Sequence, residues 1–230
     1  MTPWLIFFGF ILVALCATLV GLFLKAFYDK AFIKALVLKG LASICFVALG
    51  AISCFSGQPS PTQLLIFIGL CFGIVGDEVI ALCQVDPSRD TIWFIGGGSF
   101  FLVGHVFYVI SLFSLGNPSW IALAISYVAM ICLGLAYNKR RKFLCGEMKI
   151  PLGLYLAAVT FVGALAIGCF VGRLTLGTAL FAIGGVLFTL SDNTLFAYKL
   201  GEEPRFSQNI ILHVTYYVAQ ILFAWSICCL

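Results

Sequence analysis

Charged residues are scarce in this sequence. Lys, Arg, Asp and Glu together make up 10% of the 230 residues, whereas hydrophobic residues make up 63%. A soluble domain usually carries roughly a quarter charged residues, and the mean hydropathy here is +1.14. So few charges cannot cover a surface that faces water, so the composition excludes a soluble globular protein. The net charge of +4 follows the loops described below and does not indicate a nucleic-acid partner.

The sequence also lacks the cysteine spacings of disulfide frameworks and metal sites. Its ten cysteines lie mostly inside apolar runs, where a thiol behaves as a small hydrophobic group. We therefore expect reduced cysteines, no metal and no cofactor. No basic region precedes the first apolar run, and that run is too long for a signal peptide, so we interpret it as a membrane helix.

Eight apolar stretches are each long enough to cross a bilayer, which takes about 20 mostly apolar residues. They are Trp4–Leu24, Leu36–Phe55, Gln63–Cys83, Ile92–Leu115, Ser119–Tyr137, Ile150–Phe170, Thr175–Tyr198 and Phe206–Cys229. Turn residues or charges separate the stretches, and no soluble domain fits between them. The sequence therefore predicts an all-α, polytopic membrane bundle, with residues 1–230 as one integral membrane domain.

Basic residues gather in alternate loops. The first, third, fifth and seventh loops carry Lys25, Lys30, Lys34, Arg89, Lys139, Arg140, Arg141, Lys142, Lys149, Lys199 and Arg205. The other loops carry only Arg173. Cytoplasmic loops of membrane proteins are enriched in Lys and Arg, so both termini are predicted to face outward. The short loops favour a bacterial inner membrane.

A few ionisable residues lie inside the spans, where their cost makes each a functional candidate. They are Lys39, Asp77, Glu78, His105, Asp192 and His213, with Tyr108, Asn193, Tyr216, Tyr217 and Gln220 as polar neighbours. Counting along the spans places Lys39, Asp77, Asp192, His213, Tyr216 and Gln220 in the cytoplasmic half of the bilayer and His105 near mid-depth, so that these residues converge on one level. This pattern predicts a polar pocket that opens on one side of the membrane.

Helical spacing groups some of these residues, because positions three or four apart share a face. Asn209, His213, Tyr216 and Gln220 form one polar stripe, and His105 lies on the same face as Tyr108. Asp77 shares its face with the small residues Gly73 and Ala81, which would allow close approach of a neighbour. An aspartate followed by a His-Val-x-Tyr helix occurs twice, which predicts two parallel four-helix halves.

Several segments resemble the YhhN-type lysoplasmalogenase family. They are Gly76-Asp77, Phe100-Phe-Leu-Val-Gly-His105-Val-Phe-Tyr108, Ser191-Asp192 and Thr215-Tyr-Tyr-Val-Ala-Gln220, together with Lys39. The resemblance implies an eight-span hydrolase that cleaves the vinyl ether of lysoplasmalogens to a fatty aldehyde and glycerophosphoethanolamine or glycerophosphocholine. Its partners would be the lysophospholipid substrate and membrane lipids. Gly40 stands where proline is common in the family, and Glu78 beside Asp77 is a second departure.

A vinyl ether is stable to base and labile to acid, so its hydrolysis needs a proton donor and a negative group that stabilises the resulting cation. Two carboxylates in different environments suit this division. We therefore interpret Asp77 and Asp192 as the catalytic pair, with Asp192 favoured as the acid because its neighbours are more apolar. Lys39 would bind the headgroup phosphate or bias a carboxylate. The residues assigned to positioning are His105, Tyr108, Tyr216, Tyr217, Gln220, Asn193 and Glu78.

The sequence leaves other functions open. A small transporter or channel would use the same buried polar residues, but it would need them along a path to both faces. A structural or partner-binding protein would tolerate alanine at both aspartates, and another lipid ether or ester would suit the same fold. His105, His213 and the two aspartates are also potential zinc ligands. Each histidine and Lys39 has a structural interpretation as well, through packing or snorkelling.

Overall fold

Each predicted span is a helix in the computed structural model, which describes residues 3–141 and 149–230. The helices are α1 (Pro3–Tyr28), α2 (Phe32–Phe55), α3 (Pro61–Val85), α4 (Asp90–Ser114), α5 (Trp120–Arg141), α6 (Lys149–Gly172), α7 (Leu176–Leu200) and α8 (Phe206–Ser226). All eight are long and apolar enough to cross a membrane. The predicted all-α membrane fold is therefore confirmed. Lys142, part of the predicted basic cluster, lies outside the described residues.

Capping and turn residues define helix ends more closely than the apolar stretches do. Ser60 and Gln63 form a capping box at the start of α3, and Pro61 occupies the first helical position, where its missing N–H costs nothing. At the α4–α5 turn, Gly116 and Asn117 adopt left-handed backbone angles, with φ of 74° and 48°. Turn residues therefore separate α4 from α5, as expected between apolar stretches.

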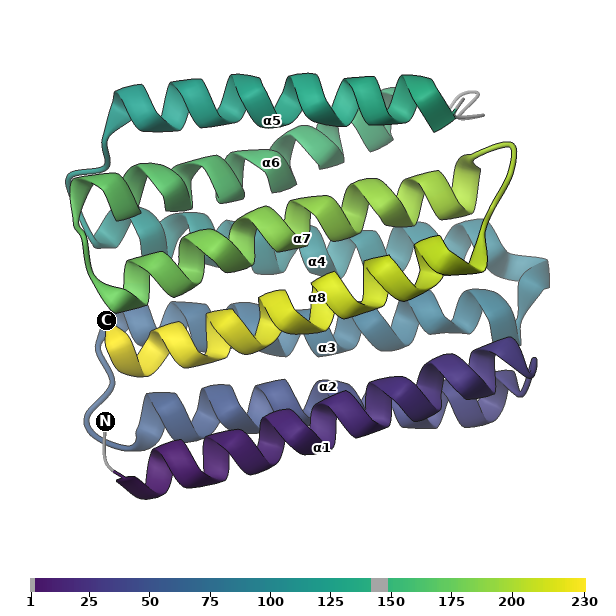
Figure 1. Ribbon diagram of the computed structural model, residues 1–230, viewed down its shortest axis with the longest axis horizontal. Coiled ribbons are helices and arrows are strands. Elements are labelled where there is room, and N and C mark those ends of the chain that lie inside the picture. Colours follow the sequence, from purple (N-terminus) through teal and green to yellow (C-terminus); the bar gives the residue numbers. More distant parts are fainter. Residues whose placement is uncertain (1–2, 142–148) are drawn as a thin grey trace.

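The helices run side by side along the long axis of the bundle, and both described ends of the chain lie at one end of it (Figure 1). We call the opposite end the basic end, because the loops after α1, α3 and α7 and the C-terminal end of α5 lie there. The helix ends and loops there carry the basic residues Lys25, Lys30, Arg89, Lys199 and Arg205. This arrangement agrees with the predicted alternation of loops. Which side of the membrane the basic end faces stays a prediction.

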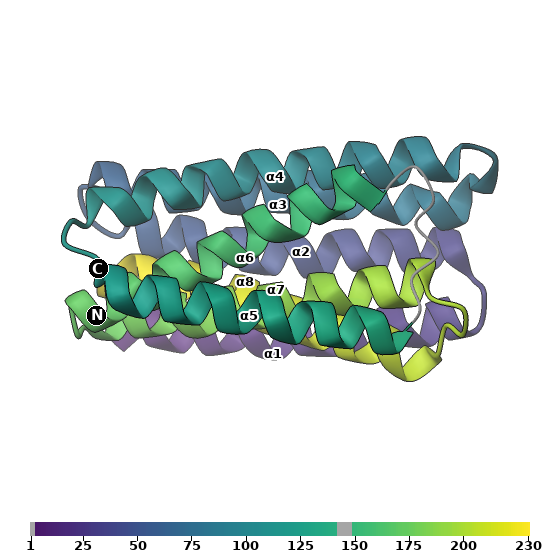
Figure 2. The same ribbon diagram turned by 90° about the horizontal axis from the view of Figure 1, so that it is seen from above.

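Helix α8 lies at the centre of the packing and contacts α7, α2, α1 and α3. Helix α5 lies at the edge of the bundle, and no residue of its most apolar segment is buried. Helix α6 crosses the bundle obliquely, so that its N-terminal half approaches α4 (Figure 2). The central position of α8 carries its polar stripe into the protein interior.

Glycines on α3 let bulky polar side chains come close. A β-carbon at Gly69 would lie 2.2 Å from Tyr108 Cε1, and one at Gly73 would lie 2.8 Å from Gln220 Nε2. A side chain at Gly69 or Gly73 would force Tyr108 or Gln220 to shift. The prediction that Gly73 allows close approach beside Asp77 is therefore confirmed.

Candidate active site

Asp77 is the centre of a buried polar network that joins α2, α3 and α8. Lys39 Nζ lies 3.1 Å from Asp77 Oδ1 and donates to the Asp77 carbonyl oxygen at 3.0 Å. Ser43 Oγ and Tyr216 OH each donate to Asp77 Oδ2 at 2.7 Å. Asp77 is 2% exposed and Lys39 5%. A carboxylate with a cation and two hydroxyl donors has the partners that a buried charge requires.

The network continues through aromatic and amide side chains. Tyr217 OH donates to the Lys39 carbonyl oxygen at 3.1 Å, and Gln220 Nε2 donates to Tyr216 OH at 2.8 Å. Tyr108 OH donates to Gln220 Oε1 at 3.4 Å. The structure thus brings together most of the polar residues chosen from the sequence. It adds Ser43, one helical turn after Lys39, which the spacing alone could have suggested.

The network is deeper than predicted. Lys39 is 7 residues into α2 (39 − 32), about 10 Å from the basic end. Tyr108 is 18 residues into α4 (108 − 90), about 27 Å from that end and past the helix midpoint. Gln220, which the sequence placed in the half of the bilayer at the basic loops, is 14 residues into α8 (220 − 206) and past its midpoint, so that placement is wrong. From Gln220 the network extends to Tyr108 across the bundle core.

Asp192 lies on α7 in a different environment. Tyr155 of α6 donates to its Oδ2 at 2.9 Å, and Asp192 is 5% exposed. Among the described residues, no hydrogen bond or ion pair joins Asp192 to Asp77 or to a cation. The two predicted catalytic carboxyls therefore have separate surroundings. Tyr155 was missed because no polar residue at helical spacing marks it in the sequence.

The two histidines are held by their own helices. His105 Nδ1 lies 2.6 Å from the Phe101 carbonyl oxygen, and the ring packs on Phe188 with centroids 4.6 Å apart. His213 Nδ1 lies 2.8 Å from the Asn209 carbonyl oxygen. A carbonyl only accepts, so in each ring Nδ1 carries a proton and donates it to this contact. Within the described chain no group of three or more His, Cys, Asp or Glu residues could hold a metal ion, so the zinc alternative lacks a ligand set.

Among the described residues, neither Asn193 nor Glu78 forms a hydrogen bond to the Asp77 network. Asn193 Nδ2 donates to the Thr189 carbonyl oxygen at 2.8 Å, on the side that faces α5. Glu78 lies against α2, where a β-carbon at Gly40 would be 3.0 Å from Glu78 Oε1. The two departures from the family pattern therefore lie against each other, since the glycine makes room for the glutamate.

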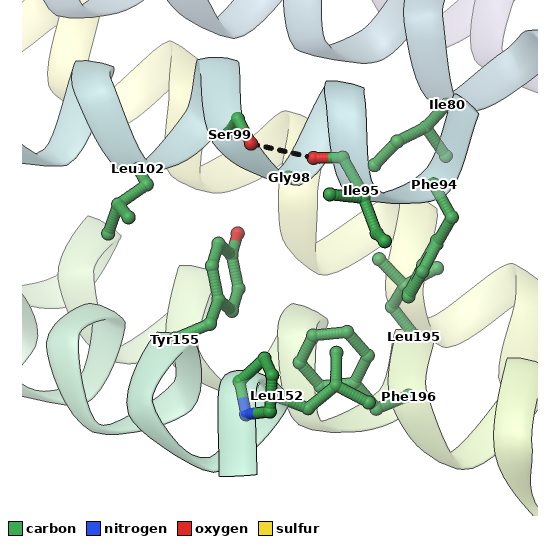
Figure 3. Close-up of a pocket in the computed structure, with 11 residues that line it drawn as sticks. Ile80, Phe94, Ile95, Gly98, Ser99, Leu102, Leu152, Tyr155, Leu195 and Phe196 are labelled. Atoms are coloured by element: carbon green, nitrogen blue, oxygen red, sulfur yellow. Dashed lines mark hydrogen bonds between the residues drawn. The ribbon is translucent and has the colours of Figure 1, made fainter. Parts of the chain in front are cut away.

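An apolar cavity of about 350 Å³ lies between α3 and α4 on one side and α6 and α7 on the other (Figure 3). Its lining is hydrophobic apart from Ser99, whose hydroxyl donates to the Ile95 carbonyl oxygen at 2.9 Å, and Tyr155. Tyr155 extends from α6 into the cavity (Figure 3), and the same hydroxyl bonds to Asp192. Ile95 and Leu102 are 47% and 39% exposed, so the cavity opens between α4 and α6 toward the lipid-facing surface.

A smaller pocket of about 50 Å³ with a mixed lining lies nearer the basic end, and we call it the polar pocket because of the polar side chains in its wall. Its polar lining consists of Lys39, Gln84, Tyr198, Lys199, Asn209 and His213. Ile80, Phe94 and Leu195 line both this pocket and the apolar cavity. The two spaces therefore adjoin, with the Tyr155–Asp192 pair at one and the Lys39–Asp77 pair at the other.

Comparisons with known proteins agree with the sequence resemblance. The model of the YhhN family matches residues 36–227. Lysoplasmalogenase TMEM86A of Homo sapiens is 34% identical over 172 residues, which cover 74% of this chain and 66% of the human protein. The Bos taurus protein of the same name is 33% identical over the same shares. The match thus spans slightly less than two thirds of these relatives, and no solved structure matches the chain.

Proposed function

The chain belongs to the YhhN family, and we propose that it hydrolyses the vinyl ether bond of lysoplasmalogens. The observation that carries this proposal is the apolar cavity that adjoins a polar pocket, with a buried carboxyl beside each space. A lysoplasmalogen has one hydrocarbon chain and one polar headgroup, and the vinyl ether lies where they meet. With the chain in the cavity and the headgroup in the pocket, that bond lies near Ile80, Phe94 and Leu195.

The partners of the two carboxyls support different roles. Asp77 has Lys39 and two hydroxyl donors, so it is the ionised carboxylate. Asp192 is buried with one hydroxyl and no cation, which favours the neutral acid. When Asp192 is protonated, the 2.9 Å contact runs in the other direction. Asp192 then donates to the Tyr155 oxygen, and the tyrosine proton is free to face the cavity.

The reaction follows from this assignment. Tyr155 passes a proton to the outer alkene carbon and receives one from Asp192, which leaves an oxocarbenium ion and an ionised Asp192. The negative charges of Asp77 and Asp192 stabilise the cation, as carboxylates do in glycosidases. Water adds to the cationic carbon and gives a proton to Tyr155, which passes its own proton back to Asp192. The hemiacetal then collapses to a fatty aldehyde and the glycerophospho-alcohol, so one water is consumed and the acid is regenerated.

The positive-inside rule favours a cytoplasmic basic end, which would place the polar pocket toward the cytoplasm and both termini outside. Short loops favour a bacterial inner membrane. Transport remains the second candidate, since the Lys39–Tyr108 network extends beyond the bundle midpoint. The asymmetry of the two adjoining spaces favours hydrolysis of an amphiphile.

Release of aldehyde tests the proposal directly. The protein purified in mild detergent should convert a lysoplasmalogen to a long-chain aldehyde, detected by mass spectrometry, with ethanolamine and choline headgroups run in parallel. A 1-O-alkyl lysophospholipid, which lacks the alkene, is the matched control and should release none. Folded protein that releases no aldehyde from either headgroup would exclude this activity and put transport first.

Filling the apolar cavity should block the hydrocarbon chain. A β-carbon at Gly98 meets no atom within 4 Å, and Gly98 lines the cavity. Leucine is therefore accommodated in the fold but occupies space that the chain needs. We expect Gly98→Leu to lower kcat/KM for a long-chain substrate about 10-fold or more, mainly through KM, because excluded methylenes lose about 0.8 kcal/mol each.

The matched control is Gly153→Leu on α6, where a β-carbon also meets nothing within 4 Å and which does not line the cavity. It should leave kcat/KM unchanged. A shorter alkenyl chain should recover part of the loss in Gly98→Leu. Equal kinetics of the two variants on the long-chain substrate would exclude this cavity as the chain site.

A further inference from the structure

The polar pocket is lined by hydrogen-bond donors whose capacity is not used. Asn209 is 1% exposed, and its Nδ2 has no hydrogen-bond partner. A buried amide left unpaired costs about 1–3 kcal/mol, so such groups usually have a partner, either in the protein or in a ligand. Asn209 lines the polar pocket, which is where a ligand would meet it.

Two lysines add further donors. Lys39 has three ammonium protons, and its described contacts, to Oδ1 and the carbonyl oxygen of Asp77, use two of them. Lys199 forms an ion pair with Asp90 at the end of the pocket near the loops. Each lysine is thus balanced by an aspartate. The pocket therefore offers donors without a large net positive charge, and it suits a ligand rich in acceptors.

We propose that this polar pocket binds the phosphate of the lysophospholipid headgroup, with Asn209 as the residue that selects for it. The assignment rests on the proposed function, because it takes the adjoining cavity as the chain site. A phosphodiester offers acceptor oxygens and no donor, which matches Asn209, Lys39 and Lys199. The main partner of Lys39 is Asp77, which is the second role that the sequence suggested for this lysine, so Asn209 and not Lys39 is the residue that we assign to selection.

Size and position agree with this ligand. One water molecule needs about 10–15 Å³ of cavity volume. The pocket of about 50 Å³ therefore holds the equivalent of three to five water-sized groups. That number suits the oxygens of one phosphate. The glycerol backbone separates the phosphate from the vinyl ether by only three carbons. The walls that the pocket shares with the cavity, Ile80, Phe94 and Leu195, place both groups within one molecule's reach.

Binding of non-hydrolysable analogues tests this inference apart from catalysis. The full-length protein in detergent is titrated with a 1-O-alkyl lysophosphatidylethanolamine and with the matching 1-O-alkylglycerol, which lacks the phosphate. We expect Asn209→Leu to weaken binding of the phospholipid analogue about 10- to 100-fold, as expected for loss of a hydrogen bond to a charged group. Binding of the alkylglycerol should be unchanged.

Two further variants protect the test against misfolding. Asn209→Asp keeps the shape but removes the donors and adds a negative charge, so it should weaken phospholipid binding at least as much. Gln208→Leu is the control, because Gln208 Nε2 is likewise buried without a partner but does not line the pocket. Thermal unfolding of each variant is measured in parallel, since Gln208 Oε1 also accepts from the Arg205 N–H at 2.8 Å.

The outcomes separate the sources of the phosphate. Inorganic phosphate in excess should compete with the phospholipid analogue in the wild type and lose this effect in Asn209→Leu. Binding of inorganic phosphate that depends on Asn209, with analogue binding that does not, would assign the pocket to free phosphate and overturn the headgroup site. An equal loss for both analogues would also overturn it. A protein that binds the analogue through Asn209 yet releases no aldehyde would refute hydrolysis and leave the phosphate site standing.

Discussion

Replacing Asp192 with asparagine should lower kcat for aldehyde release by about 100- to 10,000-fold, the usual contribution of a general acid. Asparagine keeps the shape of the side chain and can still form a hydrogen bond with Tyr155, but its amide is not acidic enough to act as a general acid. KM should change little, because Asp192 does not line either space where the substrate is proposed to lie. Single-turnover kinetics with a fixed lysoplasmalogen would measure the effect.

Two companion variants identify the cause. Tyr155→Phe removes only the hydroxyl that joins Asp192 to the cavity, so it should lower kcat by a similar factor. Thr194→Val is the control on the same helix, since the Thr194 hydroxyl donates to the Leu190 carbonyl oxygen at 2.8 Å within its own helix. Full activity in Asp192→Asn would remove Asp192 from the chemistry. If Asp192→Asn is inactive and Tyr155→Phe is fully active, Asp192 is still the acid, but proton transfer through Tyr155 is excluded.

Replacing Lys39 with methionine should have the largest effect on stability. Methionine fills similar volume, but Asp77 is then left buried with hydroxyl donors and no cation. Removing one partner of a buried ion pair costs about 3–5 kcal/mol, and Tyr217 loses no partner because it binds the Lys39 carbonyl oxygen. Thermal unfolding in detergent should therefore show a clear drop in Tm.

A double-mutant cycle separates the pair from general disturbance. Asp77→Asn removes the charge while keeping an acceptor for Ser43 and Tyr216. The double variant Lys39→Met/Asp77→Asn should be more stable than the sum of the single changes predicts, because neither buried charge remains. Strict additivity would mean that the 3.1 Å contact contributes little to the fold. Aldehyde release should stay low in all three variants.

The fold could be predicted from the sequence because each membrane span is a long run of apolar residues. Each span is an apolar run closed by charge or turn residues, and lipid allows few other solutions. Part of the Asp77 site was accessible too. Residues three and four apart on α8 define a stripe, and small residues on α3 indicate where that stripe packs.

What the sequence did not indicate depends on how the helices cross. The apolar cavity exists because α6 runs obliquely toward α4 (Figure 2), and no periodicity within α6 encodes that angle. Tyr155 acquires its partner Asp192 only through this crossing. The separation of the two carboxyls has the same origin. The sequence spacing predicted that they share a depth in the membrane, but it did not predict which side chains surround each of them. The proposed relation between two four-helix halves stays a prediction.

The opening between α4 and α6 is edged by the exposed residues Ile95 and Leu102. It determines which substrate concentration governs the rate. A substrate that enters sideways from the acyl-chain region never has to dissolve in water. Its effective concentration is its mole fraction among the surrounding lipids, so inert lipid or detergent acts as a diluent. The two products then part by solubility, the aldehyde spreading within the leaflet and the glycerophospho-alcohol leaving through the headgroup layer.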